Sequence, residues 1–496
     1  MAGFVVLLVA VVVVAVAAKP ATRRDEIRPL TTTVRNHQGA TSSGAASGGG
    51  SQASSSLSGL LLPGQSPTAP GPYALPPNIP IKHVVFMVKE NRTFNEYFGT
   101  YPGAVGSTYG KSMLHGDHIP LKPCYDQQPH DITHGFAAGL YAIDGGKMDG
   151  FDIIGDGRDL SGYTTCSRSQ IPNYWKYADR FVLADHFFTS MFGPTYPEHL
   201  YTVAAQSNGI MDNKSTVNHP GYFCDDPTEY SPHFPFATMT QAELQHAYAL
   251  ESSIGHKIPD TLVNLLNYTT PIRDCFNVKV LPDELTQAGI TWKYYNEKDH
   301  WMNALQAVKH VRYGPEWKNV VSPDRFVPDV QHHRLPQVSW LIPPAEYNEH
   351  PGEHTISICA GENWTVEQLN ALMHSPYWKN TLVVIVWDDF GGFYDPVVPP
   401  HYDVMGLGPR TPALILSPYD RRGSNPLGGY VDHTDYEFSS VLRFIELLFK
   451  LPAMTERDRQ ANPLLGALDF QDPPDLQPLV LPYRKDCPYG TDLPRT

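Results

Sequence analysis

Short apolar runs that stop abruptly at polar residues predict the strands of a buried sheet. Residues 382–387 are apolar and rich in β-branched side chains, without the alternation of a half-exposed strand. Residues 81–88 repeat this pattern. Further strands are expected from the runs at 181–190 and 338–342 and from the end of 285–295.

Helical periodicity appears between these runs. Thr434 with Glu437 forms a capping-box pattern before residues 438–449, where apolar side chains recur at i, i+3, i+4 and i+7. Thr365 with Gln368 precedes a second helical stretch. Strands that alternate with helices predict an α/β fold with a mostly parallel central sheet and helices on both faces. Residues 208–283 lack periodicity, which indicates a loop-rich insertion or lid.

Polar side chains follow two of the predicted strands. Asp388 and Asp389 come directly after residues 382–387, and Glu90 and Asn91 come shortly after residue 88. Adjacent carboxylates repel each other, and they stay ionised together when a cation lies between them. Ligands bind at the carboxyl ends of the strands in open α/β sheets, so we expect four oxygen ligands to meet there.

A threonine stands at a predicted corner between a strand and a helix. Gly193 and Pro194 force a turn, and helical spacing resumes over residues 199–206. Thr195 would therefore place its hydroxyl near a helix N-terminus, where backbone N–H groups favour an anion. An ordinary N-cap is the alternative interpretation.

The amino-terminal residues indicate export. Residues 3–18 form an apolar run of the length of a signal-peptide core, ending in small residues, and an uncleaved anchor is the alternative. Residues 19–78 are then expected to be a linker, rich in Gly and Ser and then in Pro, before a folded domain over 79–496. Both interpretations place the body of the protein outside the cytoplasm, secreted or tethered to the cell surface.

Charge and cysteine content narrow the classes of partner. The chain has 496 residues and a formal net charge of -14, with no Lys/Arg run, which argues against a nucleic-acid partner. Its six cysteines contain no CxxC pair, so a zinc cage is not expected. Cys224 and Cys275 bracket the insertion and are the first candidates for a disulfide, with six unpaired buried thiols as the alternative.

Several stretches, in order and over roughly residues 79–451, resemble one family. It comprises bacterial and plant phosphoesterases, including non-specific phospholipases C and a group of acid phosphatases, with an alkaline-phosphatase-like fold. The matching stretches are KHVVFMVKENRTFNEYFG, GGKMDGF, ADHFFTSMFGPTYPEHLY, GITWKYY, NEHP, WDDFGGFYDPVVPP, GPRTPALILSPY and HTDYEFSSVLRFIE.

The resemblance implies a metal centre and a nucleophile. The family's metal ligands match Glu90, Asn91, Asp388 and Asp389, and its Ser/Thr nucleophile matches Thr195, whose Oγ would also contact the metal. Coordination lowers the pKa of a hydroxyl enough for in-line attack on phosphorus, which would give a phosphothreonine intermediate. An all-oxygen ligand set favours calcium or magnesium ahead of zinc as the divalent ion.

The resemblance also implies histidines that face the phosphate. His350 matches one of them, and either His134 or His130 matches another, with His433 as a further candidate. Two positions depart from the family's pattern. Pro396 and Glu198 stand where many members have histidine and asparagine, and we expect Glu198 to alter the phosphate pocket.

These observations lead to an exported, metal-dependent phosphoesterase. A phospholipase C acting on phosphatidylcholine-type lipids, in contact with a membrane surface, and a broad-range acid phosphatase are nearly equal alternatives. An apolar rim near the site would favour the lipid substrate, and residues 222–236 are the candidate rim, although they could equally be packed core. A non-catalytic, metal-binding surface protein is the third hypothesis.

Overall fold

The computed structural model describes residues 69–487 and residues 64, 66 and 67, apart from 215–221, 253–257, 299, 301 and 354. The chain separates into two units, Met1–Ser55 and Ser56–Thr496, and the described residues belong to the second. The expected leader at 1–18 and most of the expected linker at 19–78 therefore lie outside the described residues, and these boundaries stay predictions.

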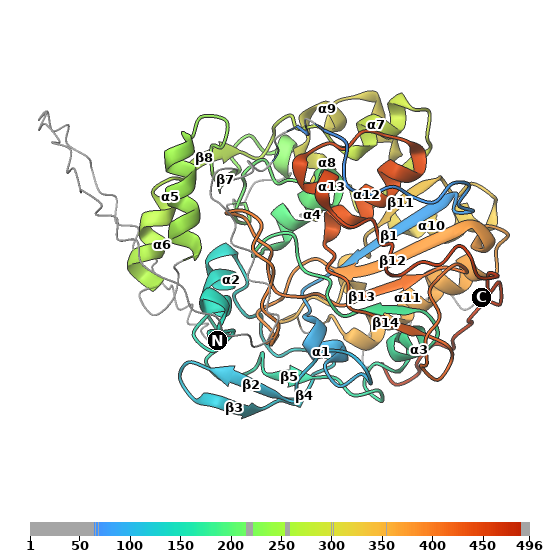
Figure 1. The fold of residues 1–496 in the computed structure, drawn as a ribbon, viewed down its shortest axis with the longest axis horizontal. Coiled ribbons are helices and arrows are strands. Elements are labelled where there is room, and N and C mark those ends of the chain that lie inside the picture. Colours follow the sequence, from blue (N-terminus) through green and yellow to red (C-terminus); the bar gives the residue numbers. More distant parts are fainter. Residues whose placement is uncertain are drawn as a thin grey trace, which may run out of the picture. The chain divides into compact units, whose positions relative to one another are not determined.

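A central sheet of eight strands runs through the molecule in the order β10-β9-β11-β1-β12-β13-β6-β14 (Figure 1). Only β13 is antiparallel to its neighbours, so the expected mostly parallel α/β sheet is confirmed. Its strands are β1 (His83–Lys89), β6 (Val182–Ala184), β9 (Trp292–Tyr295), β10 (Val320–Val321), β11 (Val338–Leu341), β12 (Thr381–Trp387), β13 (Ala413–Leu416) and β14 (Tyr430–Asp432).

Helices cover both faces of this sheet, as predicted. Successive side chains of β1 point to opposite faces, so Val84 and Phe86 enter one apolar core and Val85 and Met87 enter the other. The first core includes α4 (Thr195–Ala204), α7 (Leu281–Gln287), α8 (Ala304–Ala307) and α12 (Phe438–Phe449). The second includes α1 (Phe94–Phe98), α3 (Pro172–Arg180), α10 (Phe326–Gln331) and α11 (Ile358–Met373).

Both predicted capping boxes are wrong in position, although both helices exist. Helix α11 begins at Ile358 behind the N-cap Ser357, and Thr365 lies inside it, where its hydroxyl donates to the carbonyl of Gly361. Helix α12 is capped by Glu437, because the carboxylate of Glu437 accepts the N–H of Ser439. In both segments the buried apolar face, rather than the first Thr–Gln or Thr–Glu spacing, decides where the helix begins.

The insertion at 208–283 shares the apolar core on one face of the central sheet. It pairs β7 (Tyr230–His233) with β8 (Thr270–Arg273) and contains α5 (Gln241–Ser252) and α6 (Ile258–Leu266). Phe223 and Phe234 are buried, so the candidate rim at 222–236 forms packed core at these two positions. None of the helices among the described residues combines the length and apolarity needed to cross a bilayer.

The remaining elements are short. They are β2 (Tyr109–Ser112), β3 (Gly116–Pro120), β4 (Lys122–Pro123), β5 (Thr164–Thr165), α2 (Phe136–Ile143), α9 (Lys309–Arg312), α13 (Glu456–Gln460) and the 3-10 turns at Asp144–Gly146, Phe223–Asp225, Pro315–Asn319, Pro323–Arg325, Ala345–Tyr347 and Trp378–Asn380.

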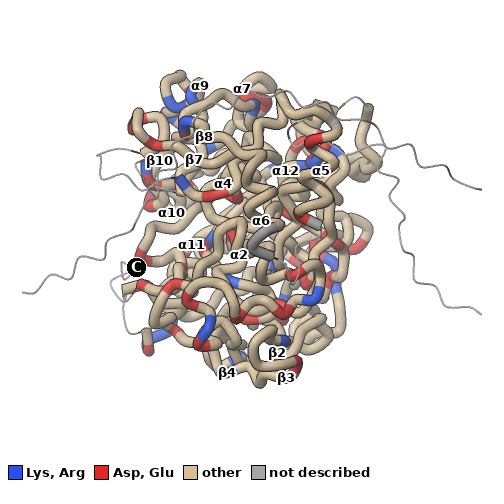
Figure 2. The backbone as a smooth tube through the Cα atoms, turned by 90° about the vertical axis from the view of Figure 1, so that its left-hand side faces the viewer, with Lys and Arg blue, Asp and Glu red and all other residues tan. Residues whose placement is uncertain are grey.

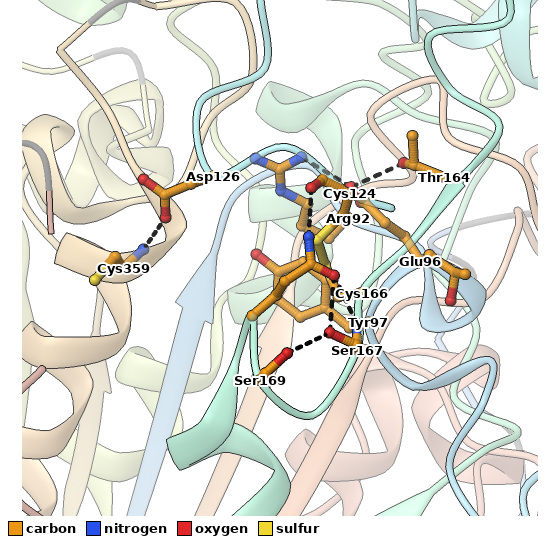
Figure 3. Close-up of a disulfide and its surroundings, with 12 residues drawn as sticks. Arg92, Glu96, Tyr97, Cys124, Asp126, Thr164, Cys166, Ser167, Ser169 and Cys359 are labelled. Carbon is orange, nitrogen blue, oxygen red and sulfur yellow. Dashed lines mark hydrogen bonds and ion pairs between the residues drawn. A yellow bond between two sulfur atoms is a disulfide. The ribbon is translucent and has the colours of Figure 1, made fainter. Parts of the chain in front are cut away.

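All six cysteines form disulfides: Cys124–Cys166, Cys224–Cys275 and Cys359–Cys487. The prediction for Cys224 and Cys275 is confirmed, and the alternative of six free thiols is wrong. The disulfide Cys124–Cys166 lies against α1, where the N–H of Cys166 donates to the carbonyl of Glu96 (Figure 3).

Lys and Arg are interspersed with Asp and Glu over the chain as seen in Figure 2, but several charged groups are fully buried. The foremost is an ion pair between Lys89, the last residue of β1, and Glu349, with Nζ 2.9 Å from Oε1. Glu349 also accepts hydrogen bonds from the hydroxyls of Tyr97 and Tyr174 and from the indole of Trp387. The pair therefore ties β1, β12, α1 and α3 together directly before the strand ends.

Removing one charge of this pair is expected to lower the free energy of unfolding more than removing both charges. Lys89→Met leaves the Glu349 carboxylate uncompensated in the interior, so we expect the free energy of unfolding to fall by about 3–5 kcal/mol. Lys89→Met combined with Glu349→Leu should cost clearly less than the two single changes added together. Urea unfolding of the three variants and the wild type measures this coupling.

The matched control is Lys147→Met, which removes a half-exposed partner of Asp144. The ammonium of Lys147 is half exposed and stays partly hydrated, although Asp144 is buried, so this change should lower the free energy of unfolding less than Lys89→Met does. Strict additivity of the Lys89 and Glu349 changes would contradict a coupled buried pair.

Candidate active site

Two metal-ligand candidates are brought together by the register of the sheet. Strands β1 and β12 are parallel neighbours in which Lys89 pairs with Trp387, so Glu90 and Asp388 follow side by side at the carboxyl edge. The backbone N–H of Asn91 donates to Oδ1 of Asp388 over 2.9 Å. The structure thus brings the predicted residues of both strand ends to one place.

The turns after these strands have backbone shapes that suit their residues. Asn91 has a φ of +59°, a left-handed conformation that asparagine tolerates better than most residues. Gly391 has a φ of +57°, and a Cβ there would lie 2.4 Å from the carbonyl oxygen of Asn91. The N–H of Gly391 donates to Oδ1 of Asp389 over 2.7 Å, which fixes the second carboxylate of the pair.

Thr195 reaches the same cluster from α4. It is the first residue of the helix, and its Oγ1 lies 3.1 Å from Oδ2 of Asp389 and 3.4 Å from Oε2 of Glu90. Pro194 holds the N-cap position, so the interpretation of Thr195 as an ordinary N-cap is wrong. The helix also begins earlier than residue 199, where the sequence pattern placed it.

The cluster is a concentration of buried negative charge. Burial, and then the charges of Asp388 and Asp389, raise the pKa of Glu90 well above its usual range. Burial and the charge of Asp389 raise the pKa of Asp388 to about 6, and burial raises the pKa of Asp389. Without a cation, the three side chains therefore resist being ionised together.

The donor set fits a divalent cation. Oδ1 of Asn91 and Oδ2 of Asp388 are buried and have no hydrogen-bond partner among the described residues. Within the described chain, the ion pairs of Glu90, Asp388 and Asp389 are with histidines and not with Lys or Arg. Buried, unpartnered oxygens around unbalanced carboxylates are the arrangement that a metal ion satisfies.

His134 and His350 stand beside this cluster, with ring centroids 5.9 Å apart. Each ring donates through Nδ1 to a backbone carbonyl, that of Ile132 or Pro351, and so offers Nε2 to the site. Burial disfavours the charged form of His134, but the carboxylates of Asp389 and Asp131 outweigh it and raise the pKa of His134 to about 9. Burial lowers the pKa of His350 to about 3.

The orientation of the Asn91 amide depends on whether His134 is protonated. Its Nδ2 lies 2.8 Å from Nε2 of His134, so it donates to the neutral ring. The charged ring would require the amide oxygen there instead, since both atoms would otherwise be donors. Protonation of His134 and the direction of the Asn91 oxygen are therefore linked.

The other two predicted histidines make their contacts elsewhere. His130 lies in an exposed loop with Nε2 3.0 Å from the carbonyl of Asp156 and 3.1 Å from the hydroxyl of Ser161. His433 follows β14, and its Nδ1 lies 2.9 Å from the carboxylate of Asp185, which comes directly after β6. No contact among the described residues joins either histidine to the Thr195 cluster, because local carboxylates and carbonyls hold both rings.

Two residues of α4 have places that the sequence prediction missed. The carboxylate of Glu198 accepts the backbone N–H groups of Ser190 and Met191, so the expected effect of Glu198 on the phosphate pocket stays a prediction. His199 lies with Nε2 3.2 Å from Oε1 of Glu90 and 3.9 Å from Oδ2 of Asp388. Burial lowers the pKa of His199 to about 4. The spacing of four residues from Thr195 on one helix was the signal that could have found it.

The chain is similar to named phospholipases over most of its length. It is 25% identical to phospholipase C A of Mycobacterium tuberculosis, over 80% of this chain and 78% of that protein. It is 26% identical to the hemolytic phospholipase C of Pseudomonas aeruginosa, over 80% of this chain and 57% of that protein. Non-specific phospholipase C3 of Arabidopsis thaliana is 23% identical, over 84% of this chain and 77% of that protein.

A solved structure was also matched. A protein in the alkaline phosphatase superfamily from Vibrio parahaemolyticus aligns with 79% of this chain and 71% of its own, at 10% identity and a TM-score of 0.34. That score is too low to add to the fold described above.

A family model also matches most of the chain. The model of the Phosphoesterase family matches residues 81–452, which begin just before β1 and end just after α12. The match spans the strand ends, α4 and both histidines of the site. Hydrolysis of phosphate ester bonds is the chemistry of this group, and the chain belongs to the Phosphoesterase family.

Proposed function

We propose that this protein is an exported, metal-dependent phospholipase C-like enzyme that hydrolyses phosphatidylcholine-type lipids through a phosphothreonine intermediate. The observation that carries the proposal is the place of the Thr195 hydroxyl, within 3.4 Å of two buried carboxylates at the ends of β1 and β12. The names of the three phospholipase C relatives support the class of substrate.

Thr195 acts as the nucleophile in this proposal. Its Oγ attacks phosphorus in line with the bond to the glycerol oxygen, and its proton passes to a neighbouring carboxylate, Glu90 or Asp389. The bond from phosphorus to the glycerol oxygen breaks, and the head-group phosphate stays on Thr195. A divalent ion held by Glu90, Asn91, Asp388, Asp389 and Thr195 would lower the pKa of the hydroxyl and offset the negative charge.

The two histidines complete the proton transfers. His134 lies between the carboxylates of Asp131 and Asp389, which favour its charged form, so we assign it the proton that the leaving glycerol oxygen takes up. His350 donates through Nδ1 to Pro351 and so presents Nε2 as an acceptor for a proton of the attacking water. That water then cleaves the bond from phosphorus to Thr195, whose oxygen takes back the proton held by the carboxylate. Transfer of the proton from His350 to His134 through solvent restores the starting state.

Disulfides support export. The three bonds use all six cysteines, and structural disulfides of this kind persist in oxidising compartments outside the cytosol. Together with the leader expected at residues 1–18, this supports the proposal of a location outside the cytoplasm.

A broad-range acid phosphatase is the second candidate. Phe223 and Phe234 of the candidate rim are buried in the insertion, so they offer no apolar surface to a lipid. A soluble phosphate ester would need no such surface. Release of product from p-nitrophenyl phosphate, p-nitrophenylphosphorylcholine and phosphatidylcholine, measured side by side, separates the two candidates, because activity on the monoester alone would favour the phosphatase.

Thr195→Ala is expected to lower kcat by at least about 10³-fold on every substrate that the wild type cleaves, because the nucleophile is lost. Thr195→Ser should keep part of the activity, since it keeps the hydroxyl. The matched control is Thr202→Ala on the same helix, which removes only a hydroxyl that donates to the carbonyl of His199. Unchanged activity of Thr195→Ala would overturn the assignment of the nucleophile.

Removal of metal is expected to destabilise the protein more at about pH 7.5 than at about pH 4.5. The pKa of Asp388 is about 6 in the folded state, so between pH 4 and 6 the folded state binds more protons than the unfolded state. Without metal, the free energy of unfolding therefore falls as pH rises through this range, on the order of 3 kcal/mol for Asp388 alone.

Thermal unfolding with and without EDTA at the two pH values measures this effect. The Tm difference caused by EDTA should be larger at the higher pH, where the carboxylates are ionised and need the cation. A difference that is equal at both pH values, or larger in acid, would contradict a metal site built from Glu90, Asp388 and Asp389.

A further inference from the structure

One side chain at the metal centre is not part of the predicted ligand set. His199 is fully buried on α4, one helical turn after Thr195, so both side chains lie on the same face of the helix. The helix that delivers the nucleophile therefore also delivers an imidazole to the carboxylates.

The position of the ring suits a ligand. Its Nε2 lies 3.2 Å from Oε1 of Glu90 and 3.9 Å from Oδ2 of Asp388, and the candidate ligand atoms of these three residues lie within 4.8 Å of one another. Oδ2 of Asp388 has no hydrogen-bond partner among the described residues. A cation between these atoms would satisfy the oxygen and the nitrogen together.

No hydrogen bond within the described chain ties the His199 ring to a group outside the carboxylate cluster. Nδ1 of His199 is buried and has no hydrogen-bond partner within the described chain. His134 and His350, in contrast, each donate through Nδ1 to a backbone carbonyl. The polar contacts of the His199 ring within the described chain are therefore all with the carboxylate cluster.

We propose that Nε2 of His199 is a nitrogen ligand of the divalent ion, which makes the donor set mixed. This inference rests on the proposed metal-dependent function. Oxygen donors alone suit calcium, magnesium and manganese, whereas an added imidazole favours zinc, iron and nickel. The centre would then select a transition metal over calcium, contrary to the preference expected from an all-oxygen set.

Electron paramagnetic resonance of the Mn²⁺-loaded protein tests this inference without measuring activity. Electron spin echo modulation of the wild type should show the ¹⁴N coupling of a directly bound imidazole, and His199→Gln should lose it. His134→Gln is the matched control, because it removes the other nearby imidazole and should keep the coupling. The Kd for Zn²⁺ of His199→Gln should rise by at least about tenfold, with a change of less than about threefold for Ca²⁺.

The outcomes distinguish this inference from the proposed function. Mn²⁺ bound by the wild type without a ¹⁴N coupling would overturn His199 as a ligand and leave a metal-dependent enzyme in place. Coupling lost in His134→Gln and kept in His199→Gln would assign the nitrogen to His134 instead. A wild type that binds neither Mn²⁺ nor Ca²⁺ would overturn both the ligand and the metal-dependent function. The wild-type spectrum decides the question even if His199→Gln does not fold.

Discussion

The interaction on which the site depends is the buried ion pair between Lys89 and Glu349. Two charges removed from water are costly unless every lone pair and hydrogen is used, and here two tyrosines and a tryptophan donate to the carboxylate while backbone carbonyls accept from the ammonium. Because Lys89 ends β1 and Trp387 ends β12, the network fixes the two strand ends relative to each other. Glu90 and Asp388 then emerge from rigid positions, which a metal centre requires.

The structure balances charge in two different ways within a few residues. Glu349 has a permanent partner in Lys89, which is part of the chain. Glu90, Asp388 and Asp389 form no ion pair with Lys or Arg among the described residues, and burial together with neighbouring carboxylates raises their pKa values. The ion pair of Glu349 stabilises the fold. The three carboxylates of the site carry an excess of negative charge that an exchangeable cation can offset. Lys89 thus neutralises the carboxylate that stabilises the fold, whereas the site carboxylates have no Lys or Arg partner among the described residues.

Much of this could be predicted from the sequence. The apolar runs of β1 and β12 and the residues at their ends identified Glu90, Asn91, Asp388 and Asp389, because a sheet buried on both faces leaves an unmistakable local pattern. The starts of α11 and α12 were misplaced, since tertiary packing extended one helix and shortened the other. Glu349 could not be placed, because its role depends on contacts between segments more than a hundred residues apart. His199 was missed, although its spacing of four residues from Thr195 was a local signal. His130 and His433 resembled site residues in sequence but are held by nearer partners.

The place of β1 in the sheet has a consequence for how the protein is made. This strand is the first of the central sheet in the chain, yet its neighbours are β11 and β12, so Val84 pairs with Val338 and Leu382. During synthesis from the amino end, this strand, whose residues 84–88 are all apolar, must wait for most of the polypeptide before it finds either partner. Until then its open edges are liable to pair with other chains. A nascent chain of this design needs to be kept apart from its copies until both partner strands have been made.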